Sequence, residues 1–349
     1  MMRPIEVGVL GGTGMVGQHF IRFLEGHPWF RLTWLGASDR SAGKKLLDAA
    51  AWRLSGDMPS AASELVVSDS KPGHAPRLVF SAMDASVATE IEREFARAGH
   101  IVVSNSRNHR MEPDVPLLVP EVNPCHLSLI HSQQQIRGWK GMIVTNPNCS
   151  TVVLTMALAP LVRFGIERVM AATMQAVSGA GYPGVPSIDI LANVVPFIGG
   201  EEEKMQQETQ KILGSVADGK AAPLNARVSA QCHRVAVADG HMVATSVEFR
   251  AKPSINDIRE ALESFRGVPQ ERNLPSAPPR PVIYMDQQDR PQPRRDAERE
   301  NGMSVFVGRL RECPVFDAKF VACGHNTIRG AAGAAVLNAE LMVSEGFLD

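Results

Sequence analysis

The segment TNPNCST, residues 145–151, places Cys149 behind two asparagines and a proline and ahead of the apolar run VVLTMALAPLV. This pattern predicts that Cys149 lies in the first turn of a helix. The positive end of a helix stabilises an anion, so a thiol there can ionise to a nucleophilic thiolate. A cysteine is also often just a small buried hydrophobic residue, and from the segment alone both interpretations stay open.

Two other reactive side chains, Arg234 and His241, flank the dipeptide Asp239-Gly240. The alternating segment 226–250 predicts two strand-like runs joined by a turn at this dipeptide, with the two side chains facing one another at the mouth of a sheet. A histidine can activate a thiol and move protons, and an arginine can hold a carboxylate through two parallel hydrogen bonds. Either residue alone is a weak signal, because a histidine beside such a turn is usually polar turn surface.

A glycine-rich segment, GGTGMVG at residues 11–17, stands between a predicted strand at 5–10 and an amphipathic helix. Glycines let the backbone turn tightly and approach a pyrophosphate, which the free N–H groups of a helix start can bind. A tight strand-to-helix turn would need the same glycines, but the strand–turn–helix context favours nucleotide binding. From this turn and the strand at 77–83 we expect cofactor contacts by Gly11, Thr13, Gly14, Met15, Val16 and Ser81.

The end of a second predicted strand, at 31–38, indicates the kind of dinucleotide. An acidic residue for an NAD ribose is normal here, but this chain has Ser38, Arg40 and Ser41. Hydroxyls and a cation suit a 2′-phosphate, so we expect NADP as the cofactor. Asp39 keeps NAD open as an alternative, and the same residues would also fit a solvated loop.

The two halves of the chain show different patterns. Strands alternate with helices up to residue 148, which predicts a parallel, doubly wound α/β sheet. The later runs at 166–178 and 226–250 alternate in polarity and predict a second, mostly antiparallel sheet. We expect that sheet to keep one apolar face for a second copy of the chain, giving a homodimer or homotetramer.

Three further segments complete the predicted organisation. A helix is expected at 201–214, an extended polar loop at 269–301, and a helix of small residues at 326–346. We expect a dinucleotide-binding domain made of residues 1–148 and 327–349 and a catalytic domain made of residues 149–326.

Composition excludes several classes of protein. A net charge of −1 over 349 residues gives no attraction to nucleic acid or to anionic lipid. No apolar run is long enough to span a bilayer, and the first residues lack a signal-peptide pattern. Five cysteines without metal-ligand spacing predict free thiols, no metal, and a cytoplasmic location.

Taken together, these segments resemble the aspartate-β-semialdehyde dehydrogenase family, in particular its archaeal and fungal branch. The resemblance runs through GVLGGTGMVGQ, SNSRNHRMEPDVPLLVPEVNP, TNPNCSTVVLTMAL, QAVSGAGYPG, PFIGGEEEKMQQETQKILG, RVAVADGH and HNTIRGAAGAAVLNAELM. It implies a Rossmann-type domain and an α+β catalytic and dimerisation domain like that of glyceraldehyde-phosphate dehydrogenase. It also implies reversible, NADPH-dependent conversion of L-4-aspartyl phosphate to L-aspartate 4-semialdehyde and phosphate, in lysine, threonine, methionine and isoleucine biosynthesis.

The resemblance also implies the reactive groups. Cys149 would form a thioester with the substrate, His241 would act as the acid/base, and Gln175 would orient the substrate or the thioester. Arg234 would bind the α-carboxylate of the substrate, and Glu201 its amino group.

The remaining implied roles concern the phosphate and the nicotinamide. Arg110, Asn148 and Lys204 would hold the phosphate of the substrate, and Asn326 would help to place the nicotinamide.

Two alternatives share part of this pattern. A malonyl-CoA or succinyl-CoA reductase would have the same cysteine, histidine and glycine-rich turn. A non-catalytic NADP-binding paralogue with a redox-sensitive thiol would need only the turn and Cys149. The joint presence of Gln175, Arg234 and His241 argues against the paralogue.

Overall fold

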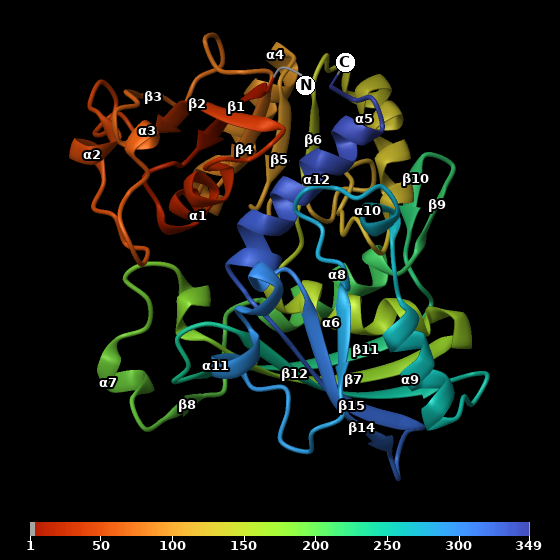
Figure 1. Ribbon diagram of the computed structural model, residues 1–349. Coiled ribbons are helices and arrows are strands. Elements are labelled where there is room, and N and C mark those ends of the chain that lie inside the picture. Colours follow the sequence, from red (N-terminus) through yellow and green to blue (C-terminus); the bar gives the residue numbers. More distant parts are fainter. Residues whose placement is uncertain (1–3, 349) are drawn as a thin grey trace.

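The computed structural model describes residues 4–348, and its first lobe is built on a six-stranded parallel sheet in the order β3-β2-β1-β4-β5-β6 (Figure 1). The strands are Ile5–Leu10 (β1), Phe30–Ala37 (β2), Val67–Asp69 (β3), Leu78–Ser81 (β4), Ile101–Ser104 (β5) and Met142–Thr145 (β6). The helices are Met15–Leu24 (α1), Leu46–Ala49 (α2), Ser60–Ser63 (α3), Ala85–Ala98 (α4), Pro124–Ser128 (η1) and Leu129–Arg137 (α5). This strand order confirms the predicted Rossmann-type lobe.

The apolar runs of the sequence explain why this sheet forms. The central strands β1, β4 and β5 are buried on both faces, as the continuous apolar runs of parallel strands require. Chain order reverses between β1 and β4, which pair in parallel. A crevice at the carboxyl ends of these two strands is where such folds bind a dinucleotide.

The second lobe is built on a seven-stranded mixed sheet in the order β13-β14-β15-β12-β7-β11-β8. Its strands are Ile166–Gln175 (β7), Val194–Val195 (β8), Arg227–Val235 (β11), His241–Phe249 (β12), Val282–Met285 (β13), Val305–Glu312 (β14) and Ala318–Gly324 (β15), beside a hairpin of Ser215–Ala217 (β9) and Lys220–Ala222 (β10). The helices are Cys149–Leu158 (α6), Ala159–Phe164 (η2), Val177–Ala180 (η3), Ser187–Ile190 (α7), Glu201–Ile212 (α8), Ile255–Ser264 (α9), Val268–Glu271 (α10), Pro293–Asp296 (α11) and Arg299–Gly302 (η4). Helices α6 and α8 lie on the side of this sheet that faces the first lobe (Figure 1).

The predicted pairing of the two runs within 226–250 is wrong. The runs form β11 and β12 as expected, but β7 lies between them, parallel to β11 and antiparallel to β12. Alternating polarity fixes which side chains face the core but does not choose the neighbouring strand. As a result Arg234 pairs with Gln175 on β7, and not with a residue of β12.

The segment 269–301 is also more ordered than predicted. It contains most of α10 and η4, all of α11, and the edge strand β13, whose Val282 and Ile283 are buried. The short apolar run VIYM supplies enough hydrophobic surface to add a strand parallel to β14, despite the prolines around it.

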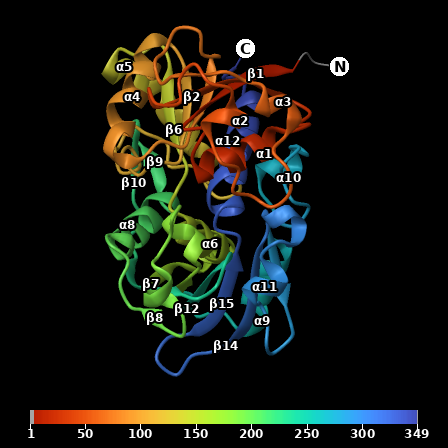
Figure 2. The ribbon, with the colours of Figure 1, turned by 90° about the vertical axis from the view of Figure 1, so that its left-hand side faces the viewer.

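The end of the chain returns to the first lobe. A short π-helix at Ile328–Ala332 (η5) leads into Gly333–Ser344 (α12), which packs into the same hydrophobic core as β1 and α1. Figure 2 shows the two lobes one above the other, with α12 running up into the first. The fully buried side chain of Arg329 fixes this return through two hydrogen bonds to Glu121, of 2.9 and 2.6 Å.

The predicted helices at 201–214 and 326–346 are confirmed as α8 and as η5 with α12. Between residues 4 and 348 no helix is both long enough and apolar enough to cross a membrane. The same residues contain no group of three or more histidine, cysteine or acidic side chains arranged to hold a metal ion.

Candidate active site

Cys149 is the first residue of α6, as the sequence predicts. The apolar residues that follow it are buried in the core of the second lobe. Asn148 caps the helix: its Oδ1 accepts hydrogen bonds from the amides of Ser150 (3.0 Å) and Thr151 (3.3 Å). Close packing against η5 fixes the other side, because a Cβ atom at Gly330 would lie 2.5 Å from the Cβ atom of Cys149.

In the protein without substrate, the surroundings of Cys149 disfavour the thiolate. Burial raises the pKa of Cys149 to about 12, and the carboxylate of Glu201 adds to this effect. Arg110, Arg234 and the Ser150 amide act in the opposite direction but do not overcome the loss of solvation. Position at a helix start is therefore insufficient to make a thiolate here.

His241 begins β12 and is fully buried. Its Nδ1 accepts a hydrogen bond of 3.0 Å from the amide of Ala176, so in the neutral ring the proton is on Nε2. Nε2 has no hydrogen-bond partner among residues 4–348. Burial, together with the nearby Arg234 and His325, lowers the pKa of His241 to about 3. The imidazole is thus neutral at physiological pH and presents a free donor.

Arg234 and Gln175 are cross-strand neighbours at the ends of β11 and β7. Arg234 Nη1 donates to the Ala176 carbonyl at 2.7 Å, while the amide of the same residue holds His241. The backbone at Gly179 passes against both groups: a Cβ atom there would lie 2.8 Å from Arg234 Nη1 and 3.0 Å from His241 Nε2. The structure therefore brings Arg234 and His241 together, although not through the predicted hairpin.

Helix α8 directs Glu201 and Lys204 to the same place. Glu201 is buried and accepts hydrogen bonds from Lys204 Nζ at 2.8 Å, Asn148 Nδ2 at 2.8 Å and Gln175 Nε2 at 3.5 Å. The next glutamate, Glu202, is engaged elsewhere, with the amide of Cys232. Glu201 is therefore the member of the glutamate run that faces Cys149.

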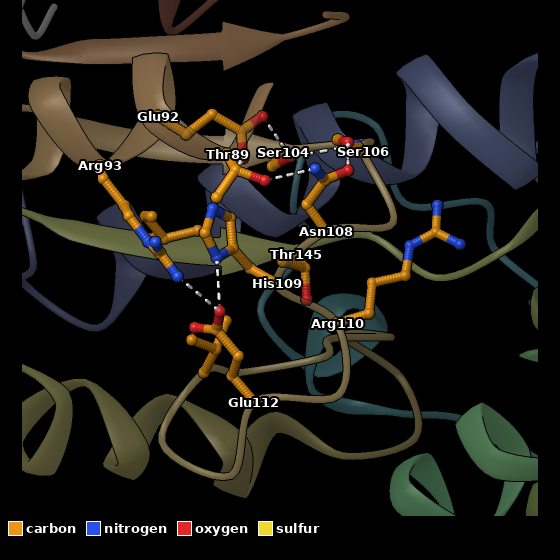
Figure 3. A network of polar contacts seen from close by, with 12 residues as sticks. Thr89, Glu92, Arg93, Ser104, Ser106, Asn108, His109, Arg110, Glu112 and Thr145 are labelled. Carbon is orange, nitrogen blue, oxygen red and sulfur yellow. Dashed lines mark hydrogen bonds and ion pairs between the residues drawn. The ribbon is translucent and has the colours of Figure 1, made fainter. Parts of the chain in front are cut away.

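Arg110 comes from the first lobe, on a loop fixed by a buried polar network (Figure 3). His109 lies between two carboxylates, with Nδ1 2.9 Å from Glu112 Oε1 and Nε2 3.6 Å from Glu92 Oε2. Ser104 donates to Glu92 at 2.6 Å, and burial raises the pKa of that carboxyl group. Figure 3 shows the guanidinium of Arg110 directed away from this network.

The guanidinium of Arg110 reaches α8. Nη1 donates to Glu208 Oε1 at 3.0 Å, and Nη2 donates to the Asn105 carbonyl at 2.7 Å. Glu208 also accepts the amide of Asn148. Nothing in the residue pattern singles out Glu208, yet its spacing of seven residues from Glu201 places both on one helix face.

The predicted cofactor turn lies at the carboxyl end of β1. Gly11 has a φ of +74°, and no side chain caps α1 at Gly14, so the amides that follow, including those of Met15 and Val16, start an uncapped helix. A Cβ atom at Gly17 would lie 2.3 Å from the Gly11 carbonyl oxygen. This close backbone approach and open helix start fit a pyrophosphate.

The other predicted cofactor residues differ in accessibility. Ser38 and Arg40 are exposed and Ser41 half-buried in the turn that follows β2, where a ribose phosphate could reach them. Ser81 is fully buried at the end of β4 beside Glu92, so its hydroxyl faces the interior.

Asn326 is buried and uses both ends of its amide within the protein. Its Oδ1 accepts from the amide of Gly240 at 2.8 Å, and its Nδ2 donates to Ser178 Oγ at 2.8 Å. Asn326 thereby joins the turn before His241 to the loop that follows Gln175.

Comparison with known proteins shows which family the chain resembles. Residues 6–130 match the semialdehyde dehydrogenase NAD-binding domain, and residues 158–329 match the semialdehyde dehydrogenase dimerisation domain. The aspartate-semialdehyde dehydrogenase of Methanothermobacter thermautotrophicus is 52% identical over 343 residues, which cover 97% of this chain and 99% of the relative. That of Schizosaccharomyces pombe is 48% identical over 354 residues, which cover 98% of this chain and 99% of the relative.

A solved structure extends the agreement to the whole fold. Aspartate-semialdehyde dehydrogenase from Candida albicans, solved with NADP, superposes with a TM-score of 0.92 at 43% identity, covering 99% of this chain and 100% of that one. With both domains matched, with relatives about 50% identical over nearly the whole chain and with a matching fold, the chain belongs to the aspartate-semialdehyde dehydrogenase family.

Proposed function

We propose that the protein reduces L-4-aspartyl phosphate to L-aspartate 4-semialdehyde with NADPH, releasing phosphate, and that the reaction runs in both directions. One observation carries the proposal: Cys149, His241, Gln175, Arg234 and Glu201 converge from five different elements of the second lobe. A thiol, a neutral imidazole, a cation and a carboxylate at one point suit a substrate that carries an acyl group, a carboxylate and an ammonium group.

Cys149 is the proposed nucleophile. Its sulfur forms a thioester with the acyl carbon as the C–O bond to phosphate breaks, which divides a difficult reduction into two steps. NADPH, when bound, supplies the hydride. His241 directs its Nε2 proton to the oxygen that gains charge at the acyl carbon, because Ala176 holds Nδ1 as an acceptor. We expect His241→Asn to lower turnover roughly 10²–10⁴-fold.

The charged residues are assigned to the ends of the substrate. Arg234 receives the α-carboxylate and Glu201 the ammonium group, while Arg110, Lys204 and Asn148 receive the phosphate. Burial and the Glu201 carboxylate raise the pKa of Cys149. An ammonium group bound at Glu201 offsets the second effect, so the thiol ionises more readily once its substrate is in place.

NADP is the proposed dinucleotide. Supporting features are the uncapped start of α1 for the pyrophosphate, with Gly11, Thr13 and Gly14 in the turn, and the exposed side chains of Ser38 and Arg40 for a 2′-phosphate. Asn326 is proposed to act on the nicotinamide through the loops it holds.

A side-by-side assay tests the substrate. We expect NADP reduction with aspartate 4-semialdehyde that requires phosphate, and no NADPH oxidation with malonyl-CoA or succinyl-CoA. Faster turnover of either CoA ester would replace the proposed substrate, and NADP binding without turnover of any substrate would indicate the non-catalytic paralogue.

We further propose that the chain forms two domains, one made of residues 1–148 and 327–349 and the other of residues 149–326. This division is supported by α12, which shares the hydrophobic core of the first sheet.

A homodimer or homotetramer is proposed because one face of the second sheet carries α6 and α8, whereas its other face leaves Met170 52% exposed. The cytoplasmic location expected from the cysteines stays a prediction.

A further inference from the structure

Glu208 is a buried carboxylate in the middle of the proposed active site. It lies on α8, seven residues after Glu201, and its residue surface is 1% exposed. A carboxylate in such a place requires hydrogen bonds to each oxygen, because removing a charge from water is costly. Its two partners are both parts of the proposed phosphate site.

Each oxygen of Glu208 holds a different element. Oε1 accepts a hydrogen bond of 3.0 Å from Nη1 of Arg110, and Oε2 accepts one of 2.7 Å from the backbone amide of Asn148. Arg110 belongs to the first lobe, whereas Asn148 caps the helix that begins with Cys149. We propose that Glu208 is a positioning residue, which holds the Arg110 guanidinium at a fixed place beside the first turn of the Cys149 helix. This inference rests on the proposed function, in which both groups receive phosphate.

The two partners explain why a carboxylate is needed at this position. Both are donors, so both side-chain oxygens of residue 208 must accept. Glutamine offers one acceptor and one donor, and its NH₂ group would face a second donor. Glu208→Gln therefore preserves size but leaves either Arg110 or the Asn148 amide without its partner.

The rest of the Arg110 surroundings holds this side chain and leaves one of its donors unused. Nη2 is engaged by the Asn105 carbonyl, and Nε is buried with no hydrogen-bond partner in residues 4–348. Lys211, three residues after Glu208, donates to the Arg110 carbonyl at 2.7 Å and so fixes the backbone of the same residue. Helix α8 thus holds both the backbone and the side chain of Arg110.

The test compares Glu208→Gln with Glu203→Gln, an exposed residue on the same helix that undergoes the same change of charge. In NADP reduction with aspartate 4-semialdehyde, we expect Glu208→Gln to raise the KM for phosphate at least about tenfold. The first-turnover burst of NADPH, which precedes phosphate attack on the thioester, should stay within about threefold of the unmodified protein. Glu203→Gln should change neither quantity.

A double-mutant cycle separates positioning from general loss of structure. If Glu208 acts through Arg110, Glu208→Gln should have no further effect on the phosphate KM in an Arg110→Gln background. Additive effects, or an unchanged phosphate KM in Glu208→Gln, would overturn the inference. The inference would also be overturned if the NADPH burst of Glu208→Gln fell in proportion to its turnover and Glu208→Asp restored neither the burst nor the turnover. That result would indicate a purely structural carboxylate.

A binding measurement keeps the inference separate from the reaction itself. Inorganic phosphate should raise the melting temperature of the protein. The phosphate concentration that gives half of this shift should be about tenfold higher, or more, in Glu208→Gln than in the unmodified protein. Failure of the unmodified protein to use phosphate in turnover would contradict the proposed function. Equal phosphate dependence of the melting temperature in both proteins would contradict the role of Glu208.

Discussion

Helices α1 and α6 both start at the carboxyl end of a strand of the first sheet, yet the two starts are built differently. Helix α1 follows β1 through Gly14, which has no side chain to cap it. Helix α6 follows β6 through Asn148, whose Oδ1 takes two amides of the first turn, while Glu208 takes the amide of Asn148 itself. An uncapped start leaves its donors for an external anion, whereas a capped start has already used them.

Burial, and not the way α6 starts, is the main cause of the raised pKa of Cys149. A helix start lowers the pKa of a thiol only where the amides of the first turn face the sulfur. At α6 the cap satisfies those of Ser150 and Thr151, although the Ser150 amide still contributes to a lower pKa, and Glu201 adds a negative charge nearby. The first turn of α1 is therefore suited to bind an anion, and the first turn of α6 is suited to hold a neutral thiol in place.

The largest expected effect separates the two helix starts by function. Cys149→Ser should lower phosphate-dependent NADP reduction by roughly 10³-fold or more, because a hydroxyl is a far weaker nucleophile than a thiolate. NADP affinity, measured by fluorescence titration, should remain unchanged because α1 is untouched. A parallel loss of NADP binding would mean that the two helix starts are not independent.

The second effect concerns ionisation of the thiol without substrate. With a pKa of about 12, Cys149 has roughly 10³-fold less thiolate at neutral pH than a thiol with a pKa near 9. Because the thiolate fraction increases tenfold per pH unit below the pKa, the rate of alkylation by iodoacetamide should rise steadily from pH 6 to 9. Mass spectrometry of the Cys149 peptide measures this rate. A plateau below pH 9 would show that the helix start does lower the pKa.

The third effect tests the uncapped start of α1. Gly17→Ala forces a Cβ atom to within 2.3 Å of the Gly11 carbonyl oxygen, so the turn must open and NADP should bind roughly 10–100-fold more weakly. The rate of Cys149 alkylation should stay the same. Gly199→Ala is the matched control, because a Cβ atom there meets no atom within 4 Å.

The smallest effect concerns the cap of α6. Asn148→Ala should lower the free energy of unfolding by about 1 kcal/mol, measured in urea, because two amides lose their acceptor. Ser254→Ala removes the exposed cap of α9 and should cost a similar amount. Only Asn148→Ala should also slow phosphate-dependent turnover, and equal turnover in both variants would remove Asn148 from the proposed site.

The sequence was sufficient to predict individual helices and strands, but not which strands lie next to one another in a sheet. Apolar runs and the glycine-rich turn correctly predicted β1, α1, α6 and α8, because these patterns depend on neighbours in the chain. The pairing of β11 with β7 was missed, since residues 227–235 fit equally well beside any strand with an apolar face. The buried run at 282–285 was missed because the prolines and arginines around it resemble a loop.

The same limit applies to the site. Cys149, Arg234 and His241 carry side chains whose chemistry is evident in the sequence, and the structure brings them close to one another. Glu208 was missed because an acid in the run EEEKMQQETQKI is normally a solvated helix residue. Its spacing from Glu201 places both residues on one helix face, which is visible in the sequence. That Arg110, on a loop of the other lobe, contacts Glu208 is visible only in the structure.

The return of α12 to the first lobe has a consequence for biosynthesis. The core around β1 includes residues 332–342, and the Arg329–Glu121 ion pair joins parts of the chain that are 208 residues apart. A nascent chain leaving the ribosome therefore cannot complete its nucleotide-binding lobe until the second lobe has been synthesised. Removal of α12 would therefore leave an unfilled cavity in the core of the N-terminal lobe.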